Sequence, residues 1–190
     1  LVPVLGLSGA IKGAAAANLL AAAWLLREHR VVGVLSVGIL VAGLLLPAWN
    51  PKVLSAGSFL YGDQISKRAR SARMDLRTYV DQQSEVEAEE WDAYGLVTVH
   101  RNREGARSMR INGKVDASSG AADMLTQRYL AHLPLLHHPD PKRVLVVGLG
   151  AGVTLGAAAR YPVQKIVCVE ISPAVARAAR HFKEANEGSL

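Results

Sequence analysis

The stretch VLVVGLGAG at positions 144–152 constrains the fold most, because it predicts a buried strand that runs directly into a glycine-rich turn. A run of β-branched residues and leucine is typical of a parallel strand covered on both faces. A second such run, KIVCVE, ends in Glu170, and the residues between the two suit a helix. The next segment, SPAVARAARHFKEAN, starts with Ser172 as an N-cap and Pro173 at the first helical position. The sequence therefore predicts an α/β fold with a Rossmann-like β-α-β unit.

The glycine turn and the acid after the second strand together indicate a nucleoside site. Glycine lets the backbone bend sharply and lets a ligand approach without a Cβ in the way. Glu170, 22 positions after Gly148, stands where an acid accepts hydrogen bonds from ribose hydroxyls. The spacing is G-x-G-x-G, with Val153 in place of the last glycine of the dinucleotide motif. This favours a single nucleoside such as S-adenosylmethionine; the alternative is a purely structural turn.

A small β-domain is predicted ahead of this unit, over residues 93–120. GLVTVHR and RSMRING alternate apolar and polar residues, and NREG between them supplies the turn of a hairpin. Residues 121–190 form the N-terminal part of the Rossmann-like domain, and their first helix, AADMLTQRYLAHLP, should stop at Pro134. Residues 50–92, first basic and then acidic, are interpreted as a juxtamembrane linker with a solvated face.

The first 49 residues predict two transmembrane helices, at about 1–26 and 31–49. The second run has 19 residues without a charge, and about 20 apolar residues cross a bilayer. Basic residues are more numerous after Trp49 than in the loop with Arg27 and Arg30. We therefore expect a multi-pass protein of the inner membrane, with lipid as a partner and the domain after Trp49 in the cytoplasm. This basic flank beside a membrane span explains the positive charges there without nucleic-acid binding.

Cysteine and histidine indicate neither a disulfide framework nor a metal site. Cys168, the single cysteine, lies in an apolar strand pattern and fits a small buried hydrophobic residue. His132, His137 and His138 suggest no convergent cluster of ligands.

From Gly95 to Pro173 the sequence resembles the spermidine synthases. NGKVDAS, the helix with AHLP, the stretch HHPDPKRVLVVGLGAGV and the strand ending in Glu170 follow the order of that family's motifs. The apolar start, WNPKVLSAGSFLY and YGLVTVHR look like the membrane-fused spermidine synthase-like proteins. With Leu1 instead of an initiator methionine, and an end just after the second helix, the chain is interpreted as a fragment of such a protein.

The resemblance implies a transferase that moves an aminopropyl group from decarboxylated S-adenosylmethionine to a small-molecule amine. Ala151 replaces the family's acid, Thr126 its tyrosine and Gly95 its glutamine. The family's catalytic acids fall beyond Leu190, so no catalytic residue is assigned and the 190 residues alone should be inactive. The residues implied to bind the cofactor are Gly148, Gly150, Ala151, Gly152, Glu170, Ile171 and Gln127.

Two other functions stay open. Loss of the acid at Ala151 favours a methyltransferase that uses S-adenosylmethionine on the same scaffold. The third hypothesis is a non-catalytic nucleoside-binding sensor coupled to the membrane helices. The acceptor amine, and whether the protein forms a homo-oligomer, are left open by the sequence.

Overall fold

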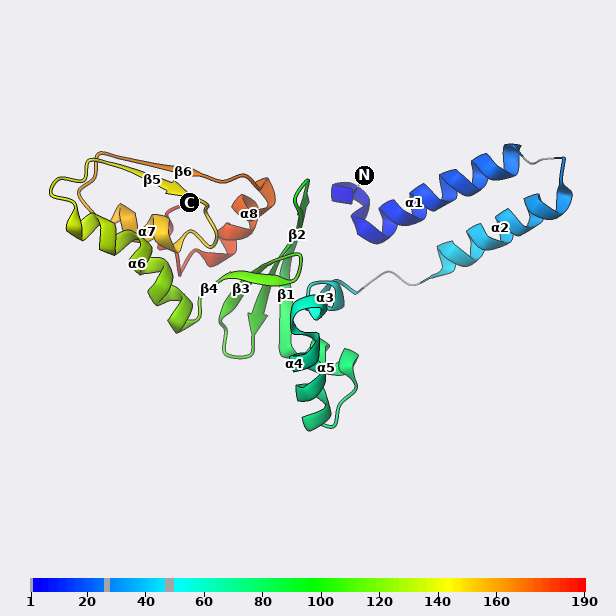
Figure 1. The fold of residues 1–190 in the computed structure, drawn as a ribbon, viewed down its shortest axis with the longest axis horizontal. Helices are drawn as coiled ribbons and strands as arrows, with labels where there is room; N and C mark the ends of the chain where they lie inside the picture. Colours follow the sequence, from blue (N-terminus) through cyan, green and yellow to red (C-terminus); the bar gives the residue numbers. More distant parts are fainter. Residues whose placement is uncertain (1, 26–27, 47–49) are drawn as a thin grey trace. The chain divides into compact units, whose positions relative to one another are not determined.

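The computed structural model describes residues 2–25, 28–46 and 50–190, in two compact units, Leu1–Asn50 and Pro51–Leu190. The first unit consists of α1 (Val2–Leu25) and α2 (Arg30–Leu45). The elements of the second unit are, in order, α3 (Pro51–Leu54), α4 (Ser58–Ser71), α5 (Leu76–Gln83), β1 (Ser84–Asp92), β2 (Gly95–Asn102), β3 (Arg107–Ile111), β4 (Lys114–Ser118), α6 (Ala121–His137), β5 (Arg143–Val147), α7 (Val153–Ala159), β6 (Lys165–Val169), α8 (Pro173–Ala178) and the 3-10 helix η1 (Ala179–Phe182) (Figure 1).

The helices of the first unit correct the prediction of two membrane spans. Helix α1 is broken at Gly6, where φ is 67° and ψ is 171°, and it carries Lys12 and Asn18 in a stretch rich in alanine. Helix α2 has 16 residues, about 24 Å of helix against a hydrocarbon core of about 30 Å. Within the described residues, no helix combines the length and the apolarity needed to cross a bilayer. The predicted spans and the multi-pass membrane location are therefore wrong; Leu1, residues 26–27 and residues 47–49, on which part of that prediction fell, lie outside the described residues.

Lys12 joins the two helices of the first unit. Its ammonium donates hydrogen bonds to the carbonyl of Leu44, at 3.3 Å, and to that of Leu46. The last carbonyls of a helix have no partner within the helix and carry partial negative charge, so a cation at this position is stabilising. Lys12 therefore fastens α1 to the C-terminal end of α2.

Strands β1 to β4 form an antiparallel sheet in sequence order, with two different faces. Val97, Val99 and Met109 are buried on one face and pack in a core with α8 and Phe182. Thr98 and His100 alternate with them along β2 and are buried on the other face. The sequence predicted the hairpin of β2 and β3, and the structure adds β1 and β4 on either side of it.

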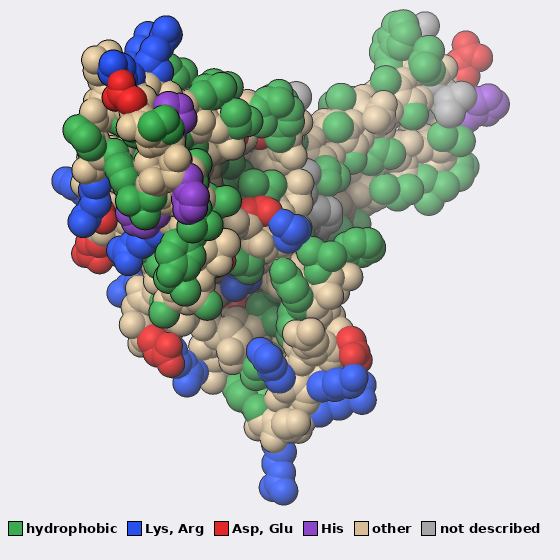
Figure 2. Space-filling view, turned by 60° about the vertical axis from the view of Figure 1, so that its left-hand side comes forward, with side chains coloured by type: hydrophobic (Ala, Val, Ile, Leu, Met, Phe, Trp, Pro, Cys, Tyr) green, Lys and Arg blue, Asp and Glu red, His purple; other side chains and the backbone are tan. Residues whose placement is uncertain are grey.

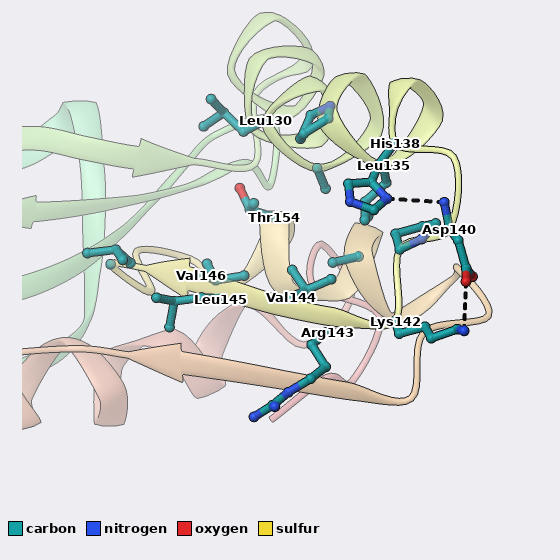
Figure 3. Close-up of a pocket in the computed structure, with 16 residues that line it drawn as sticks. Leu130, Leu135, His138, Asp140, Lys142, Arg143, Val144, Leu145, Val146 and Thr154 are labelled. Atoms are coloured by element: carbon teal, nitrogen blue, oxygen red, sulfur yellow. Dashed lines mark hydrogen bonds and ion pairs between the residues drawn. The ribbon is translucent and has the colours of Figure 1, made fainter.

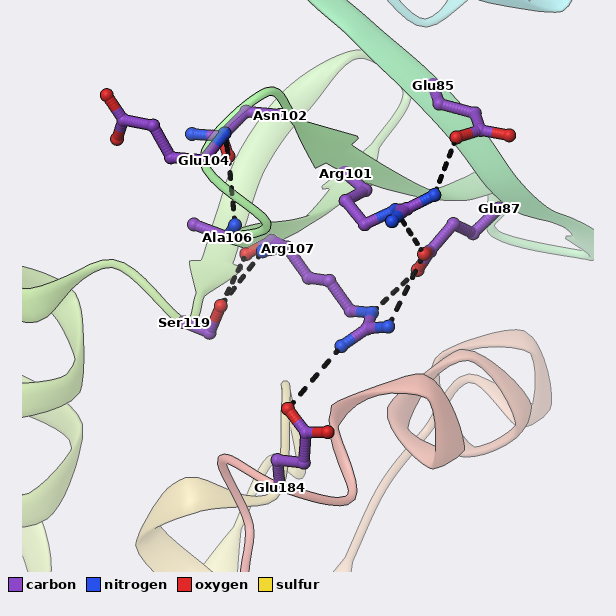
Figure 4. Close-up of polar contacts among 9 residues, drawn as sticks. All are labelled: Glu85, Glu87, Arg101, Asn102, Glu104, Ala106, Arg107, Ser119 and Glu184. Carbon is purple, nitrogen blue, oxygen red and sulfur yellow. Dashed lines mark hydrogen bonds and ion pairs between the residues drawn. The ribbon is translucent and has the colours of Figure 1, made fainter.

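Strand β1 occupies residues that we expected to belong to a linker. Glu87 lies at an irregularity in the pairing with β2. Its carboxylate forms ion pairs with Arg107 Nε, at 2.6 Å, and with Arg101 Nε, at 2.8 Å. Glu85 also pairs with Arg101, at 2.8 Å, and Glu184 approaches Arg107 at 4.0 Å (Figure 4). The acidic run thus forms a strand because arginines of β2 and β3 supply the opposite charges.

The second half of this unit contains the predicted β-α-β arrangement, which confirms the α/β fold. Strands β5 and β6 pair in parallel, with α7 between them in the chain. The hydroxyl of Ser172 accepts a hydrogen bond from Val175 N at 3.1 Å, and Pro173 begins α8, as expected. Helix α6, in contrast, continues through Pro134 to His137, so the prediction that it stops there is wrong. A proline inside a helix removes one N–H donor, and α6 accommodates this one.

Helix α8 connects the antiparallel sheet to the parallel strands. Asp92, at the end of β1, accepts hydrogen bonds from the hydroxyl of Ser172 and from Ala174 N, the latter at 3.1 Å. Arg177 Nε donates to Glu90 at 2.6 Å from the same helix. A carboxylate is favoured at a helix N-terminus, where amides lack partners. The sheet is thereby fixed against the end of β6 where the glycine turn also lies.

Candidate functional site

The turn after β5 has a backbone shape that favours glycine at three positions. Gly148, Gly150 and Gly152 have φ values of 85°, 54° and 79°. A Cβ built on Gly148 would meet no atom within 4 Å, so its backbone conformation, rather than crowding, favours glycine there. Gly148 N donates to Val169 O at 2.8 Å, which holds the turn against the end of β6.

Glu170 bridges the turns that follow the two parallel strands. One oxygen of its carboxylate accepts a hydrogen bond from Leu149 N at 2.8 Å, and the other accepts one from Ser172 N at 2.9 Å. The side chain is half-buried, and a carboxylate has about four acceptor sites. Two hydrogen bonds therefore orient Glu170 and leave it able to accept more.

A cavity of about 290 Å³ lies between the glycine turn and the inner face of the antiparallel sheet. Gly150, Glu170 and Ile171 line it from the side of the parallel strands. Tyr94 and Asp116 line it from the sheet. The cavity offers backbone at Gly150, apolar surface, and carboxylates from two different elements.

Three other residues predicted to bind the cofactor, Gln127, Ala151 and Gly152, do not line this cavity. Ala151 is fully buried in the core, and its carbonyl accepts from Asn186 Nδ2 at 3.0 Å. Gln127 on α6 donates to Ser118 O at 2.9 Å, and its own carbonyl accepts from the hydroxyl of Thr154 at 2.8 Å. Gly152 caps α7. Their assignment to cofactor binding stays a prediction.

Gly148 lines a second, larger hollow of about 670 Å³ between α6 and β5. Leu130, Leu135 and Leu145 give it an apolar wall, and His138, Asp140 and Lys142 close one end through a chain of polar contacts (Figure 3). Figure 2, which brings this end of the second unit forward, shows apolar side chains exposed there among histidines and basic side chains.

Asp116 and Tyr94 are the cavity residues that sequence reasoning missed. Asp116 forms an ion pair with Lys114 on the same strand. Its signal was the short alternation KVDAS after the Asn-Gly turn, which is typical of a further strand. Tyr94 sits in the turn between β1 and β2, and its position depends on β1, which the acidic composition concealed.

Cys168 on β6 is half-buried and does not carry the features of a nucleophile. Burial, followed by the negative charge of Glu170, raises the pKa of its thiol. A thiol held protonated is a poor nucleophile.

The fold and the site define a Rossmann-like α/β protein with an antiparallel sheet in front of its glycine turn. Residues 123–188 match the family model described as the spermine/spermidine synthase domain. A solved structure of spermidine synthase in complex with the transition state analogue AdoDATO superposes with a TM-score of 0.50 and 26% identity, over 54% of this chain and 36% of that one. The chain is thus spermidine synthase-like over this region, and its relatives include a spermidine synthase and polyamine aminopropyltransferases.

The names of the similar curated proteins refer to spermidine, polyamines or putrescine. Spermidine synthase of Dictyostelium discoideum is 44% identical over 57 residues, which are 30% of this chain and 20% of that protein. A polyamine aminopropyltransferase of Desulforudis audaxviator is 36% identical over 77 residues, 40% of this chain and 28% of that protein. Putrescine N-methyltransferase 2 of Nicotiana tabacum is 46% identical over 54 residues, 28% of this chain and 15% of that protein. The matches span less than a third of the length of each of these relatives.

Proposed function

We propose that this protein is an aminopropyltransferase whose cavity between the glycine turn and the sheet holds decarboxylated S-adenosylmethionine. The observation that carries the proposal is the meeting of Gly150, Glu170 and Ile171 on one wall of that cavity. A solved structure of spermidine synthase supports the proposal, because it resembles this chain over 54% of the chain and is a complex with the transition state analogue AdoDATO.

In the proposed reaction, the lone pair of an amine nitrogen attacks the methylene carbon beside the sulfonium of the donor. The new C–N bond forms while the C–S bond breaks, its electrons remain on sulfur as methylthioadenosine leaves, and the resulting ammonium releases its proton to solvent. Glu170 would accept hydrogen bonds from the ribose hydroxyls, as acids at this position do. Asp116, on the opposite wall, would offer negative charge to the cationic donor or amine. No residue of this chain is assigned the role of general base.

The donor site is tested by isothermal titration calorimetry with decarboxylated S-adenosylmethionine, S-adenosylmethionine and methylthioadenosine. We expect Glu170→Gln to raise the dissociation constant at least about 10-fold, because a hydrogen bond to a charged group contributes about 1.5–3 kcal/mol. Glu104→Gln, on the exposed turn between β2 and β3, is the matched control and should bind like the unsubstituted chain. Equal affinity in Glu170→Gln would refute the site.

A methyltransferase that uses S-adenosylmethionine is the second candidate, and the similarity to putrescine N-methyltransferase favours it. The two functions differ in the donor, since decarboxylation removes the carboxylate. In the same titration, tighter binding of decarboxylated S-adenosylmethionine supports aminopropyl transfer, and tighter binding of S-adenosylmethionine supports methyl transfer.

A further inference from the structure

A second cavity, of about 280 Å³, lies on the opposite face of the antiparallel sheet, under α3, α4 and α5. Three cationic side chains from three different elements line it: Lys52 of α3, Arg68 of α4 and Arg110 of β3. Tyr61 and Tyr79 add hydroxyl groups. Among the described residues that line this cavity there is no aspartate or glutamate, so the side chains of the lining carry a net positive charge.

Arg110 has a hydrogen-bond donor that no described group satisfies. Its Nη1 donates to Ser55 O at 3.1 Å, whereas its Nε is buried and lacks a partner among the described residues. Burial lowers the pKa of Arg110, yet a guanidinium stays charged in proteins. A buried donor without an acceptor is destabilising, so Arg110 keeps unused hydrogen-bonding capacity beside the cavity.

His100 forms a fixed, neutral part of the same wall. Its Nε2 lies 2.9 Å from the hydroxyl of Ser55 and 3.1 Å from that of Thr98, and its Nδ1 lies 2.9 Å from the hydroxyl of Ser84. Burial, then the charges of Arg110 and Lys52, lower the pKa of His100 to about 3. At neutral pH the imidazole therefore neither adds charge to the cavity nor competes for an anion.

We propose that this cavity binds a phosphate group, either inorganic phosphate or the phosphate of a small monoester. A tetrahedral group presents oxygens in several directions, which suits cations that converge from a short helix, a long helix and a strand. A carboxylate presents two oxygens in one plane and fits a single arginine fork better. The site lies on the face of the sheet away from the glycine turn and does not depend on the proposed transferase activity.

The test is calorimetric titration of the 190-residue chain with inorganic phosphate and with glycerol 3-phosphate, at constant ionic strength set with potassium chloride. We expect saturable binding of at least one of the two phosphate compounds, with the tighter ligand identifying the source of the phosphate. Arg110→Gln should weaken that binding at least 10-fold.

Two variants of α4 keep the test decisive if Arg110→Gln fails to fold. Arg68 is exposed and lines the cavity, whereas Arg70 is exposed on the same helix and does not line it. Arg68→Gln should weaken phosphate binding several-fold, and Arg70→Gln should leave it unchanged. The absence of saturable binding, equal effects of the two α4 variants, or tighter binding of succinate than of either phosphate compound would each overturn the proposal.

Discussion

At the scale of single residues, His100 couples the stability of the sheet to pH. It is 2% exposed, and its pKa of about 3 lies below the value near 6.5 expected in the unfolded chain. Between these values the unfolded state binds a proton that the folded state does not. The contribution of His100 to the free energy of unfolding is therefore fully present above pH 6.5. It decreases as the pH falls below 6.5, by up to about 1.4 kcal/mol per pH unit.

Urea unfolding of the chain between pH 7 and pH 5 measures this dependence. We expect His100→Asn to lower the stability at pH 7, because it disturbs the hydrogen bonds to Ser55 and Ser84, but to flatten the dependence on pH. His137→Asn, at an exposed position of α6, should retain the slope of the unsubstituted chain. A slope that survives in His100→Asn would contradict the assignment.

Gly156 in α7 is required by close packing. A Cβ at this position would lie 2.4 Å from the backbone oxygen of Asn186, which cannot rotate away as a side chain could. We expect Gly156→Ala to lower the free energy of unfolding by about 1–3 kcal/mol, despite the better helix propensity of alanine. Gly62→Ala in α4, where a Cβ meets nothing within 4 Å, should raise it by about 0.5–1 kcal/mol. Chemical denaturation measures both, and equal effects would show that the contact with Asn186 is unimportant.

At the scale of elements, strands were predictable where apolar residues alternate and hidden where charges do. β2, β3, β5 and β6 follow apolar patterns, and the sequence indicated each of them. β1 carries an alternation of acids whose meaning depends on Arg101 and Arg107, and these arginines belong to other strands. Local composition cannot distinguish a solvated acidic linker from a strand whose charges are matched across a sheet.

The pair of Glu87 and Arg107 should therefore contribute measurably to the sheet. Their side chains are 17% and 28% exposed, and the hydrogen bond from Arg107 lowers the pKa of Glu87. We expect Glu87→Gln to cost about 1 kcal/mol near pH 7. The difference from the unsubstituted chain should shrink as the pH falls below 4.5, because Glu87 of the unfolded chain is protonated there while the folded carboxylate, with its lowered pKa, is protonated only at lower pH.

Glu85→Gln is the matched control for this prediction, because Glu85 lies on the same strand as Glu87 and pairs with Arg101 of β2, but its side chain is 66% exposed. An exposed pair contributes about 0–1 kcal/mol. Guanidinium chloride is a salt and would screen these ion pairs. Urea unfolding at several pH values is therefore the suitable measurement. A loss in Glu85→Gln as large as that in Glu87→Gln would remove the special role of Glu87.

At the scale of the whole molecule, local signals predicted the β-α-β unit and half of the candidate site, whereas packing decided the rest. Gly150, Glu170 and Ile171 were predicted together because one turn and one strand end carry them. Asp116 lines the same cavity from β4, a strand that the sequence prediction did not include. The membrane prediction failed because apolar content does not fix helix length: α2 ends at Leu45, and Leu46 is already extended.

The exposed apolar surface of the second unit should make the 190-residue chain self-associate. Among the described strands β5 pairs with β6 alone, and Leu145 and Val147 on β5 are 63% and 80% exposed. An open, apolar strand edge favours pairing with another chain. We expect sedimentation velocity to show concentration-dependent association that the double substitution Leu145→Lys and Val147→Lys reduces. Phe59→Lys, which removes an even more exposed apolar side chain from α4, should not reduce it, and the same effect from both changes would argue against this surface.

The bridge that Glu170 makes between Leu149 N and Ser172 N has a thermodynamic consequence for any ligand that reaches it. A glutamate that is free in solution loses rotamer freedom when it is ordered, at a cost of about 0.5–1.5 kcal/mol. Here that loss occurs when the chain folds, so the Glu170 carboxylate is already oriented before a ligand binds. Ligand binding should consequently carry little of the entropy cost of ordering this side chain.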